Sequence, residues 1–289
     1  MTLFREIKGE KKMYFLADPL AFIIRPIYKL IGDYGITLII VTILIRLLTI
    51  PFTVMSQKSM AKTQLIQPEM ARLQEKYKND KNKLSIEMQK LYKKHDVNPM
   101  GGCLPLIVQM FILFGFIGVV YNPLQYIFQL SKDQIAQISQ SVGANAATYQ
   151  VTLCGMEGVK EKVLELVGGK IPFDFNFFGI DLTLNLKGNE TDILMWLFPV
   201  LAVVATVISG KITKIQQAQQ TNGKVNEQAQ SMSDSMMMIM PVMTAMFTYT
   251  MPAGMSLYWF VSTAFQILQQ TVINNIINEK VKKEMEEKK

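Results

Sequence analysis

The chain contains few of the residues from which catalytic and metal sites are built. It has one histidine, His95, and two cysteines, Cys103 and Cys154, among 289 residues. Such small numbers exclude a disulfide framework, and their spacing does not match a metal site. The sequence also lacks an HExxH motif, a phosphate-binding glycine loop and a plausible serine–histidine–acid set. We therefore expect neither an enzyme nor a bound cofactor, and no small-molecule substrate.

Charged residues are nearly absent from several long stretches. Hydrophobic residues make up 49% of the chain, and they are gathered in runs that alternate with densely charged segments. An apolar run of about 20 residues is typical of a membrane-spanning helix. The expected fold class is an all-α membrane protein with five spans. The spans are predicted at 34–54, 104–129, 193–210, 236–252 and 255–275. The second span lies in the segment 103–130, and the last three lie in the segment 193–275.

The N-terminal segment, residues 1–33, carries no clear signal peptide, because charges and prolines interrupt its apolar residues. Apolar side chains nevertheless recur at helical spacing between residues 20 and 32. This pattern predicts an amphipathic helix that lies along the membrane surface. Met13 is an alternative start of the chain. The apolar stripe of the predicted helix consists of Phe22, Ile23, Ile27 and Leu30.

Two short amphipathic helices are predicted in the segment 55–102. Apolar residues step by three or four positions along each helix, and the turn-like sequence NDKN at 79–82 separates them. This spacing is typical of a helical hairpin with facing apolar seams. A simple connector is the plainer interpretation, but the length of the helices favours a docking element. The seams are Ile66, Met70, Leu73 and Tyr77, and Leu84, Met88 and Leu91.

Lysine and arginine are distributed unevenly between the predicted loops. Segment 55–102 holds ten of them, and the longer segment 131–192 holds five. Because basic loops stay on the cytoplasmic side, the first segment is predicted to be cytoplasmic and the second extracytoplasmic. The loop 211–235 and the tail 276–289 then lie in the cytoplasm, and the N-terminus lies outside. The net charge of +7 is assigned to topology and to anionic membrane lipids, with no specific nucleic-acid partner.

Arg46 is the one formal charge in the first predicted span. Helical rise places it about 12 Å from the end of that span at Val54, a depth that snorkelling reaches only in part. A charge at this depth is costly and usually faces a polar cavity. No Asp or Glu occurs in the five predicted spans. The candidate partners are water, backbone carbonyls, lipid phosphate and an acidic group of a client protein.

Polar side chains are predicted near the depth of Arg46. Thr42, Thr49 and Thr53 share its helix face, and Gln109 lies about 9 Å from the cytoplasmic end of the second span. This pattern indicates a water-filled groove in the cytoplasmic leaflet. In the plainer interpretation, each threonine bonds its own helix backbone and each glutamine joins two helices. The last span adds a polar stripe of Tyr258, Ser262, Gln266 and Gln269.

The fourth predicted span is rich in methionine and joins the fifth through the turn MPAG at 251–254. Methionine is flexible and polarisable, so methionine-rich surfaces repack against many different apolar segments. The methionines therefore have two interpretations: an adaptable binding surface, or ordinary apolar residues that only fill the span. The methionines are Met236, Met237, Met238, Met240, Met243, Met246 and Met251.

Three blocks of the sequence are specific and ordered. They read YGITLIIVTILIRLLTIPFTVMSQKSMAKTQLIQPEMARLQEKYKNDKNKL at 34–84, NPMGGCLPLIVQM at 98–110 and MPAGMSLYWFVSTAFQILQQ at 251–270. They resemble the first core span with its cytoplasmic hairpin, the start of the second span, and the final hairpin with the last span of the YidC membrane protein insertases. The resemblance covers roughly residues 20–275. It is strongest to the five-span form of Gram-positive bacteria, a multi-pass protein of the bacterial cell membrane.

The resemblance implies a function and a mechanism. Family members insert membrane proteins and help them fold, alone or with the Sec translocon. Their span arginine, here Arg46, lies in a hydrophilic groove that is open to cytoplasm and lipid and draws in the polar tail of a client. Thr42 and Trp259 match client-contact positions, with Tyr258 adjacent, and Gln109 matches a groove glutamine. The implied partners are nascent membrane proteins, the Sec translocon and, through the C-terminal tail, the ribosome.

Two other functions are compatible with an arginine in a span. An anion channel or transporter would use Arg46 as its ion site, but it predicts a continuous pore and repeated broken helices, and no internal repeat is present. A purely structural assembly factor would tolerate neutralisation of the groove. The sequence departs from the resemblance in two segments: 131–192 is longer than expected, and 276–289 is short and mixed in charge.

Overall fold

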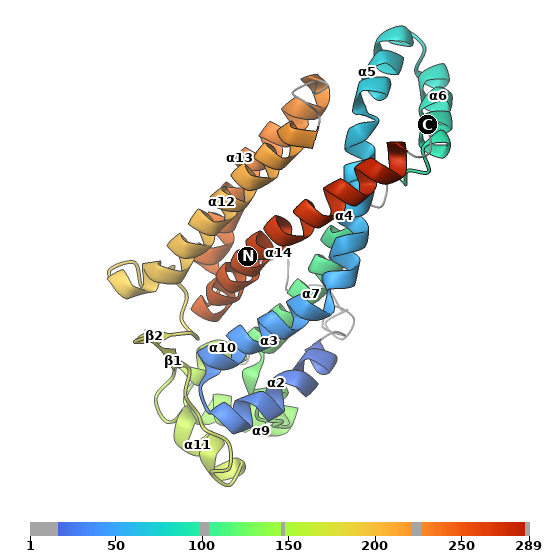
Figure 1. Ribbon diagram of the computed structural model, residues 1–289. Coiled ribbons are helices and arrows are strands. Elements are labelled where there is room, and N and C mark those ends of the chain that lie inside the picture. The colour runs from blue at the N-terminus through green and yellow to red at the C-terminus, as the bar shows by residue number, and fades with distance from the viewer. Residues whose placement is uncertain (1–16, 99–103, 146–147, 221–226, 287–289) are drawn as a thin grey trace. The chain divides into compact units, whose positions relative to one another are not determined.

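The computed structural model of the protein describes residues 17–98, 104–145, 148–220 and 227–286. The alternative start at Met13, the middle of loop 211–235 and the last residues of the tail lie outside this part. The chain divides into two compact units, and Figure 1 shows its helices and strands. The first unit comprises Met1–Ile45, Gln109–Val203 and Thr244–Ser262, and the second comprises Arg46–Val108, Val204–Met243 and Thr263–Lys289.

Helices dominate the described residues, which confirms the prediction of an all-α protein. The strands found among these residues, β1 (Asn176–Phe177) and β2 (Ile180–Asp181), form one short antiparallel hairpin. The helices are α2 (Ala17–Ile31), α3 (Tyr34–Leu48), α4 (Ile50–Leu65), α5 (Gln67–Lys76), α6 (Lys81–Lys94), α7 (Leu104–Tyr121), α8 (Pro123–Tyr126), α9 (Lys132–Ser141), α10 (Gln150–Cys154), α11 (Val159–Leu166), the 3-10 helix η3 (Ile193–Trp196), α12 (Leu197–Gln220), α13 (Glu227–Thr250) and α14 (Ala253–Glu286).

The described helices differ in whether they are long and apolar enough to cross a membrane. Within the described ranges, the segment Ile193–Gln216 meets this criterion by length and composition. Tyr34–Leu48 and Ile50–Leu65 meet it only together, and their axes are bent by 53°. Ile107–Tyr121 and Met237–Thr250 are apolar but shorter. The arrangement in five spans therefore remains a proposal.

The first predicted span is interrupted at Thr49. The sequence pattern predicts one helix over 34–54, whereas α3 ends at Leu48 and α4 begins at Ile50. Pro51 explains the break, because proline has no N–H to donate to the carbonyl four residues earlier and its ring crowds that carbonyl, whereas the first turn of a new helix tolerates it. The Thr49 hydroxyl donates to the Arg46 carbonyl at 3.0 Å, which satisfies one of the acceptors that the helix end leaves open.

The core of the first unit includes the segment 131–192, which is folded rather than an open loop. Besides three helices and the β-hairpin, this segment contributes buried aromatic and aliphatic side chains such as Phe175, Ile180 and Leu182. Phe175 packs edge-on against Tyr34 of α3, with ring centroids 4.9 Å apart. Aromatic pairs of this geometry add about 0.5–1.5 kcal/mol beyond the area that they bury. The length of the segment thus reflects a structural role.

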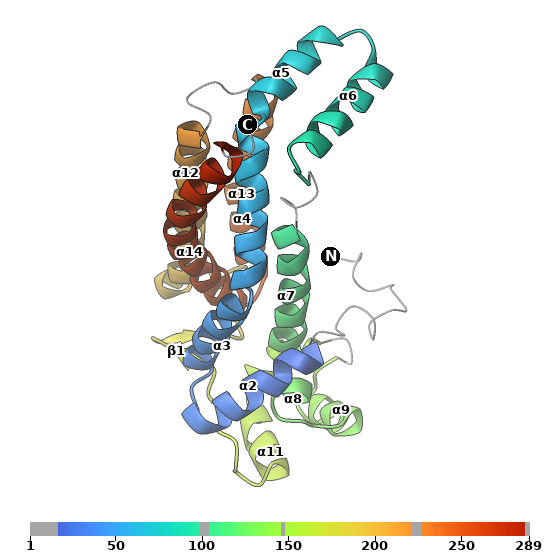
Figure 2. The same cartoon turned by 45° about the vertical axis from the view of Figure 1, so that its right-hand side comes forward.

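Helix α2 buries one face against the protein and leaves part of the predicted apolar stripe exposed. The predicted stripe includes Phe22 and Leu30, which are 78% and 86% exposed. The buried face instead carries Ala17, Leu20, Ala21, Ile24 and Tyr28, and α2 contacts α8 (Figure 2). The helix is apolar on more than one side, so periodicity alone does not select the side that packs. Its position along the membrane surface remains a proposal.

Tyr28 and Tyr34 are both fully buried but differ in the partners of their hydroxyl groups. The Tyr28 hydroxyl donates to the Pro172 carbonyl at 2.8 Å, and burial raises its pKa to about 12. The Tyr34 hydroxyl has no hydrogen-bond partner among the described residues. We expect Tyr28→Phe to lower the free energy of unfolding by about 1 kcal/mol, and Tyr34→Phe to leave it unchanged or raise it. Chemical unfolding of both variants in detergent measures the difference, and equal losses would contradict it.

Phe178 occupies an unfavourable backbone conformation at the tip of the β1–β2 hairpin. Because Phe177 pairs with Ile180, Phe178 and Gly179 form a two-residue turn, with φ of 52° and 78°. Positive φ at both positions is the pattern of a type I′ turn, which favours Asn-Gly. Holding a side chain other than glycine in this region costs on the order of 1–3 kcal/mol. The Phe178 ring meets that of Phe177 edge-on, with centroids 4.6 Å apart, but it is 77% exposed, so packing within the protein offsets only part of this cost.

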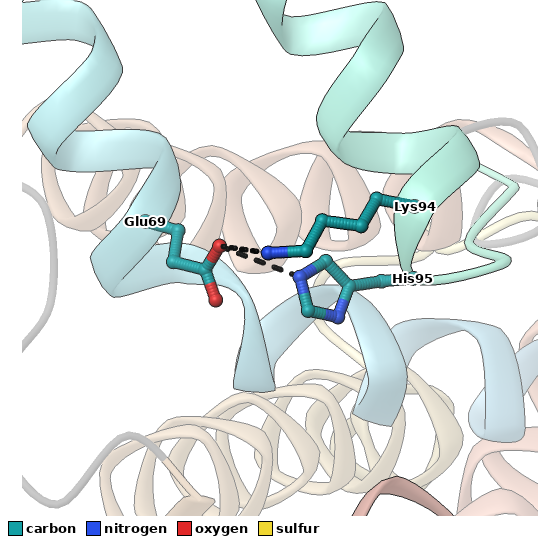
Figure 3. Close-up of polar contacts among 3 residues, drawn as sticks. All are labelled: Glu69, Lys94 and His95. Carbon is teal, nitrogen blue, oxygen red and sulfur yellow. Dashed lines mark hydrogen bonds and ion pairs between the residues drawn. The ribbon is translucent and has the colours of Figure 1, made fainter. Parts of the chain in front are cut away.

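The second unit contains a helical hairpin formed by α5 and α6. Ile66, Leu91 and Val97 are its buried centre, and the Asp80 carboxylate caps α6 by accepting from the Lys83 amide at 2.9 Å. At the open end, one Glu69 oxygen lies 3.4 Å from His95 Nε2 and 3.8 Å from Lys94 Nζ (Figure 3). Surface ion pairs of this kind contribute little, so the apolar seam is what holds the hairpin together.

Candidate functional site

The five predicted site residues lie in helices α3, α7 and α14. Thr42, Gln109, Tyr258 and Trp259 belong to the first unit, and Arg46 is the residue at which the second unit begins. Thr42 and Arg46 are one turn apart on the continuous helix α3.

Gln109 and Tyr258 are joined by a hydrogen bond. The Gln109 side-chain amide donates to the Tyr258 hydroxyl at 3.0 Å, and Tyr258 is 2% exposed. The ring of Phe116 stacks on that of Tyr258, with centroids 4.1 Å apart and planes at 28°. Gln109 and Phe116 are two turns apart on α7, so one face of this helix supplies both contacts. Tyr258 is therefore fixed at its ring and at its hydroxyl.

The start of α14, which carries Tyr258, is held by main-chain bonds to the segment 182–187. The Gly254 amide donates to the Leu182 carbonyl at 3.0 Å, and the Ala253 amide donates to the Leu184 carbonyl at 2.8 Å. The Lys187 amide in turn donates to the carbonyl of Tyr249 at 3.0 Å. These three bonds, here called the turn clamp, pair the folded segment with the α13–α14 turn. The clamp thereby sets where α14 begins.

Trp259 and Thr42 differ in their exposure and in the kind of contact that they make. Trp259 is half-buried, and its ring stacks on Phe247, with centroids 5.9 Å apart. Thr42 is buried, and its hydroxyl donates to the Leu38 carbonyl at 2.6 Å. The same bond to its own helix is made by Thr53, whose hydroxyl donates to the Thr49 carbonyl. Both threonines therefore behave as the plainer interpretation predicts.

Arg46 is half-buried in the last turn of α3. Its carbonyl accepts from the Thr49 hydroxyl and, at 3.3 Å, from the side-chain amide of Gln269 in α14. A cation in the last turn of a helix lies at the negative end of the helix dipole, which favours it by roughly 0.3–1 kcal/mol. The break at Thr49 thus gives Arg46 a helix end in the middle of an apolar sequence.

The bond between Gln109 and Tyr258 has a measurable energy. We expect a double-mutant cycle of Gln109→Leu and Tyr258→Phe to give a coupling on the order of 0.6 kcal/mol, which is typical of hydrogen bonds between membrane helices. Phenylalanine keeps the stack on Phe116, so the cycle isolates the polar contact. Unfolding of the single and double variants in detergent measures it, and strictly additive losses would disprove the bond.

Sequence reasoning missed the aromatic partners in this site. Phe116 and Phe247 lie within the apolar runs of their predicted spans, and each stacks on a predicted site residue. The spacing of seven between Gln109 and Phe116 was a signal that they share a face. Phe247 offered no such signal, because its partner Trp259 lies beyond the turn at 251–254.

The described residues offer no obvious place for a metal or a reactive thiol. Within the described ranges, no three His, Cys, Asp or Glu side chains are close enough together to hold a metal ion. Cys154 is buried in the core of the first unit. Burial raises the pKa of its thiol well above the ordinary value, which makes it unreactive.

Known proteins are similar to this chain over most of its length. The family model described as the 60Kd inner membrane protein matches residues 26–281. The membrane protein insertase YidC of Fusobacterium nucleatum is 30% identical over 254 residues, which cover 88% of this chain and 92% of that protein. The insertase YidC of Prosthecochloris aestuarii is 35% identical over 267 residues, 90% of this chain but 37% of that protein. That of Pelagibacter ubique is 50% identical over 109 residues, 38% of this chain.

These matches define a class of membrane protein, the insertases. The chain belongs to the YidC family of membrane protein insertases. It spans nearly all of its relative from Fusobacterium, but well under half of the longer relatives, such as that of Prosthecochloris. The family identity does not support the alternative of an anion channel or transporter.

Proposed function

We propose that the protein inserts integral membrane proteins into the bacterial cell membrane and helps them fold, through a positively charged hydrophilic groove. The observation that carries the proposal is Arg46, a half-buried cation within an apolar helix of a chain that matches the insertase family along residues 26–281. Thr42, Gln109, Tyr258 and Trp259 are the further groove residues. Gln109 and Trp259 are partly exposed and can contact the client, whereas the buried Thr42 and Tyr258 support the groove wall.

The physical task is to lower the cost of moving a polar tail across the bilayer. A charge at the bilayer centre costs at least about 2.5–3.5 kcal/mol. A groove open to the cytoplasm and to lipid shortens the apolar distance that the tail must cross. Arg46 attracts an acidic tail, while the adjoining apolar segment of the client moves sideways into lipid. The process needs no nucleotide and no covalent step.

We further propose five spans, with the N-terminus outside and the C-terminus in the cytoplasm. The ten basic residues of segment 55–102 support a cytoplasmic position for the α5–α6 hairpin. There the hairpin receives nascent membrane proteins, and the ribosome and the Sec translocon are further partners. Membrane lipids are also partners, and no nucleic acid is specifically bound.

The exposed methionines of α13 support a compliant client-facing or lipid-facing surface. Met238 and Met246 are 76% and 57% exposed, and Met240 and Met243 are each 40% exposed. Flexible thioether side chains adapt to apolar segments of different shape. A protein that binds many different clients gains from an adaptable surface, because the clients do not share a single shape that a rigid surface could complement.

Insertion into vesicles that contain only this protein tests the proposal. A short single-span client with an acidic N-terminal tail is added, and protease protection of the tail measures its translocation. We expect protection that depends on the protein, without flux of chloride across the same vesicles. Absence of protection above that of empty vesicles would refute an autonomous insertase. Chloride flux without protection would instead indicate a channel.

A further inference from the structure

Phe178 combines two features that packing within the first unit does not explain. It holds the positive φ of a type I′ turn, where Asn or Gly is favoured, and its ring is 77% exposed. An exposed turn of this type in water is expected to carry a small polar residue. Strain that persists at an exposed position points to a function for the side chain.

The hairpin that carries Phe178 is held firmly in place. The neighbouring Phe177 packs against Gly35 of α3, where even a Cβ atom would collide with its ring. Phe177 also stacks on Phe198 of α12, with centroids 6.1 Å apart and planes at 20°. The direction in which Phe178 projects is therefore set by the core. Its exposure is a property of the fold and not of a loose loop.

The tip of the hairpin lies beside the first turn of a membrane-spanning segment. A Cβ atom on Gly179 would lie 3.6 Å from the Leu194 side chain, and the β1–β2 hairpin and the start of α12 are neighbours in Figure 1. Together these elements form an uncharged patch, here called the aromatic tip. Its members are Phe178 (77% exposed), Ile193 (85%), Leu194 (50%), Trp196 (42%) and Leu197 (41%).

Polar groups at the edge of the aromatic tip resemble those at a lipid–water boundary. The Trp196 ring is partly exposed, and its Nε1 donates to the Glu190 carbonyl at 3.0 Å. The carboxylates of Glu190 and Asp192 stand just before the apolar run, where Asp192 accepts from the Leu194 amide at 2.9 Å. Tryptophan with one polar and one apolar side is enriched at such boundaries.

We propose that the aromatic tip is inserted into the interfacial layer of the lipid bilayer and anchors segment 131–192 to the membrane. Lipid is the occupant, because the patch continues directly into Ile193–Gln216, the segment whose length and composition fit a span. Lipid contact also explains Phe178, since a ring in the bilayer compensates for its backbone strain. The inference concerns the placement of this segment and does not rest on the proposed insertase activity.

Leu166, at the end of α11, is a matched control on the same unit. It is also apolar and 44% exposed, but it lies among the exposed charged residues Lys160, Glu161 and Glu165. These charges would be costly in lipid, so Leu166 faces water. Exposed apolar character alone therefore does not define the aromatic tip.

The test is the depth of a fluorescent label. Cys103 and Cys154 are replaced by alanine, and Phe178→Cys, Ile193→Cys and Leu166→Cys are made singly and labelled with an NBD fluorophore in protein-only phospholipid vesicles. We expect the labels at 178 and 193 to emit further to the blue than the label at 166. Lipids with a doxyl group near the head of the acyl chain should quench the labels at 178 and 193 several-fold more strongly than the label at 166. Aqueous iodide should quench the labels at 178 and 193 less than the label at 166.

Two results would overturn the proposal. In the first, the label at 178 matches the label at 166 in emission and in quenching by iodide, which would place the tip in water. In the second, Phe178→Cys oxidises efficiently to a disulfide-linked dimer and its label escapes lipid quenching, which would place a second copy over the tip. Co-flotation of each labelled variant with the vesicles on a density gradient verifies in each preparation that the protein is inserted.

Discussion

Replacing Arg46 with alanine should reduce the insertion of clients with acidic tails by about tenfold. The reason is the loss of attraction between the guanidinium and the incoming carboxylate, which at a partly screened site about 10 Å away is on the order of 1–2 kcal/mol. Arg46→Lys keeps the charge and should retain most of the activity. Protease protection of the client tail in reconstituted vesicles measures all three proteins.

The matched control for Arg46 is a client whose acidic residues are replaced by glutamine. Its insertion should depend much less on Arg46, because no charge is attracted. Equal insertion of the acidic client by the alanine variant would remove Arg46 from the mechanism. A loss of equal size for the acidic and the neutral client would mean that Arg46 supports the fold of α3 rather than attracting charge.

Replacing Gly35 with alanine should destabilise the first unit by about 1–3 kcal/mol, the usual cost of overpacking. Alanine normally stabilises a helix by about 0.5–1 kcal/mol relative to glycine. A loss of stability in Gly35→Ala would therefore indicate a steric collision, and a gain would indicate free space. The added methyl group collides with the ring and Cβ of Phe177, which the core holds from the other side. We expect a lower midpoint of chemical unfolding in detergent and faster proteolysis of segment 131–192.

Gly210→Ala is the control for Gly35→Ala. Its new Cβ would lie 3.4 Å from the Cγ of Met237, an ordinary contact with a flexible side chain. This variant should be as stable as the parent protein or more stable by up to about 1 kcal/mol. If both glycine variants had the same midpoint of unfolding, Phe177 would not approach α3 as closely as the structure shows.

The sequence predicts the helical elements well because their signals are local. An apolar run predicts a helix such as α12, and steps of three and four between apolar residues predict seams such as that of Ile66 and Leu91. Prolines also act locally, and Pro51 was visible in the sequence. Its consequence was missed because the apolar run continues across it, and hydrophobicity counted along a window does not register a lost hydrogen bond.

Features that depend on contacts between distant residues were not predictable in this way. The buried face of α2 is selected by what packs on it, including Phe128 of a later segment, and not by its own periodicity. The fold of segment 131–192 depends on aromatic contacts with α3. For the candidate site, the hydrogen bond between Gln109 and Tyr258 and the stacking partner of Trp259 both required the structure.

The turn clamp has a consequence for the barrier that a membrane must maintain. Its three main-chain bonds open together if the α13–α14 turn separates from segment 182–187, and each contributes about 0.5–1.5 kcal/mol. At about 3 kcal/mol in total, fewer than roughly one molecule in a hundred would be open at any moment. Because backbone atoms make these bonds, most single side-chain substitutions leave them in place. In the proposed insertase, protons and small ions would thus rarely find a path at this turn.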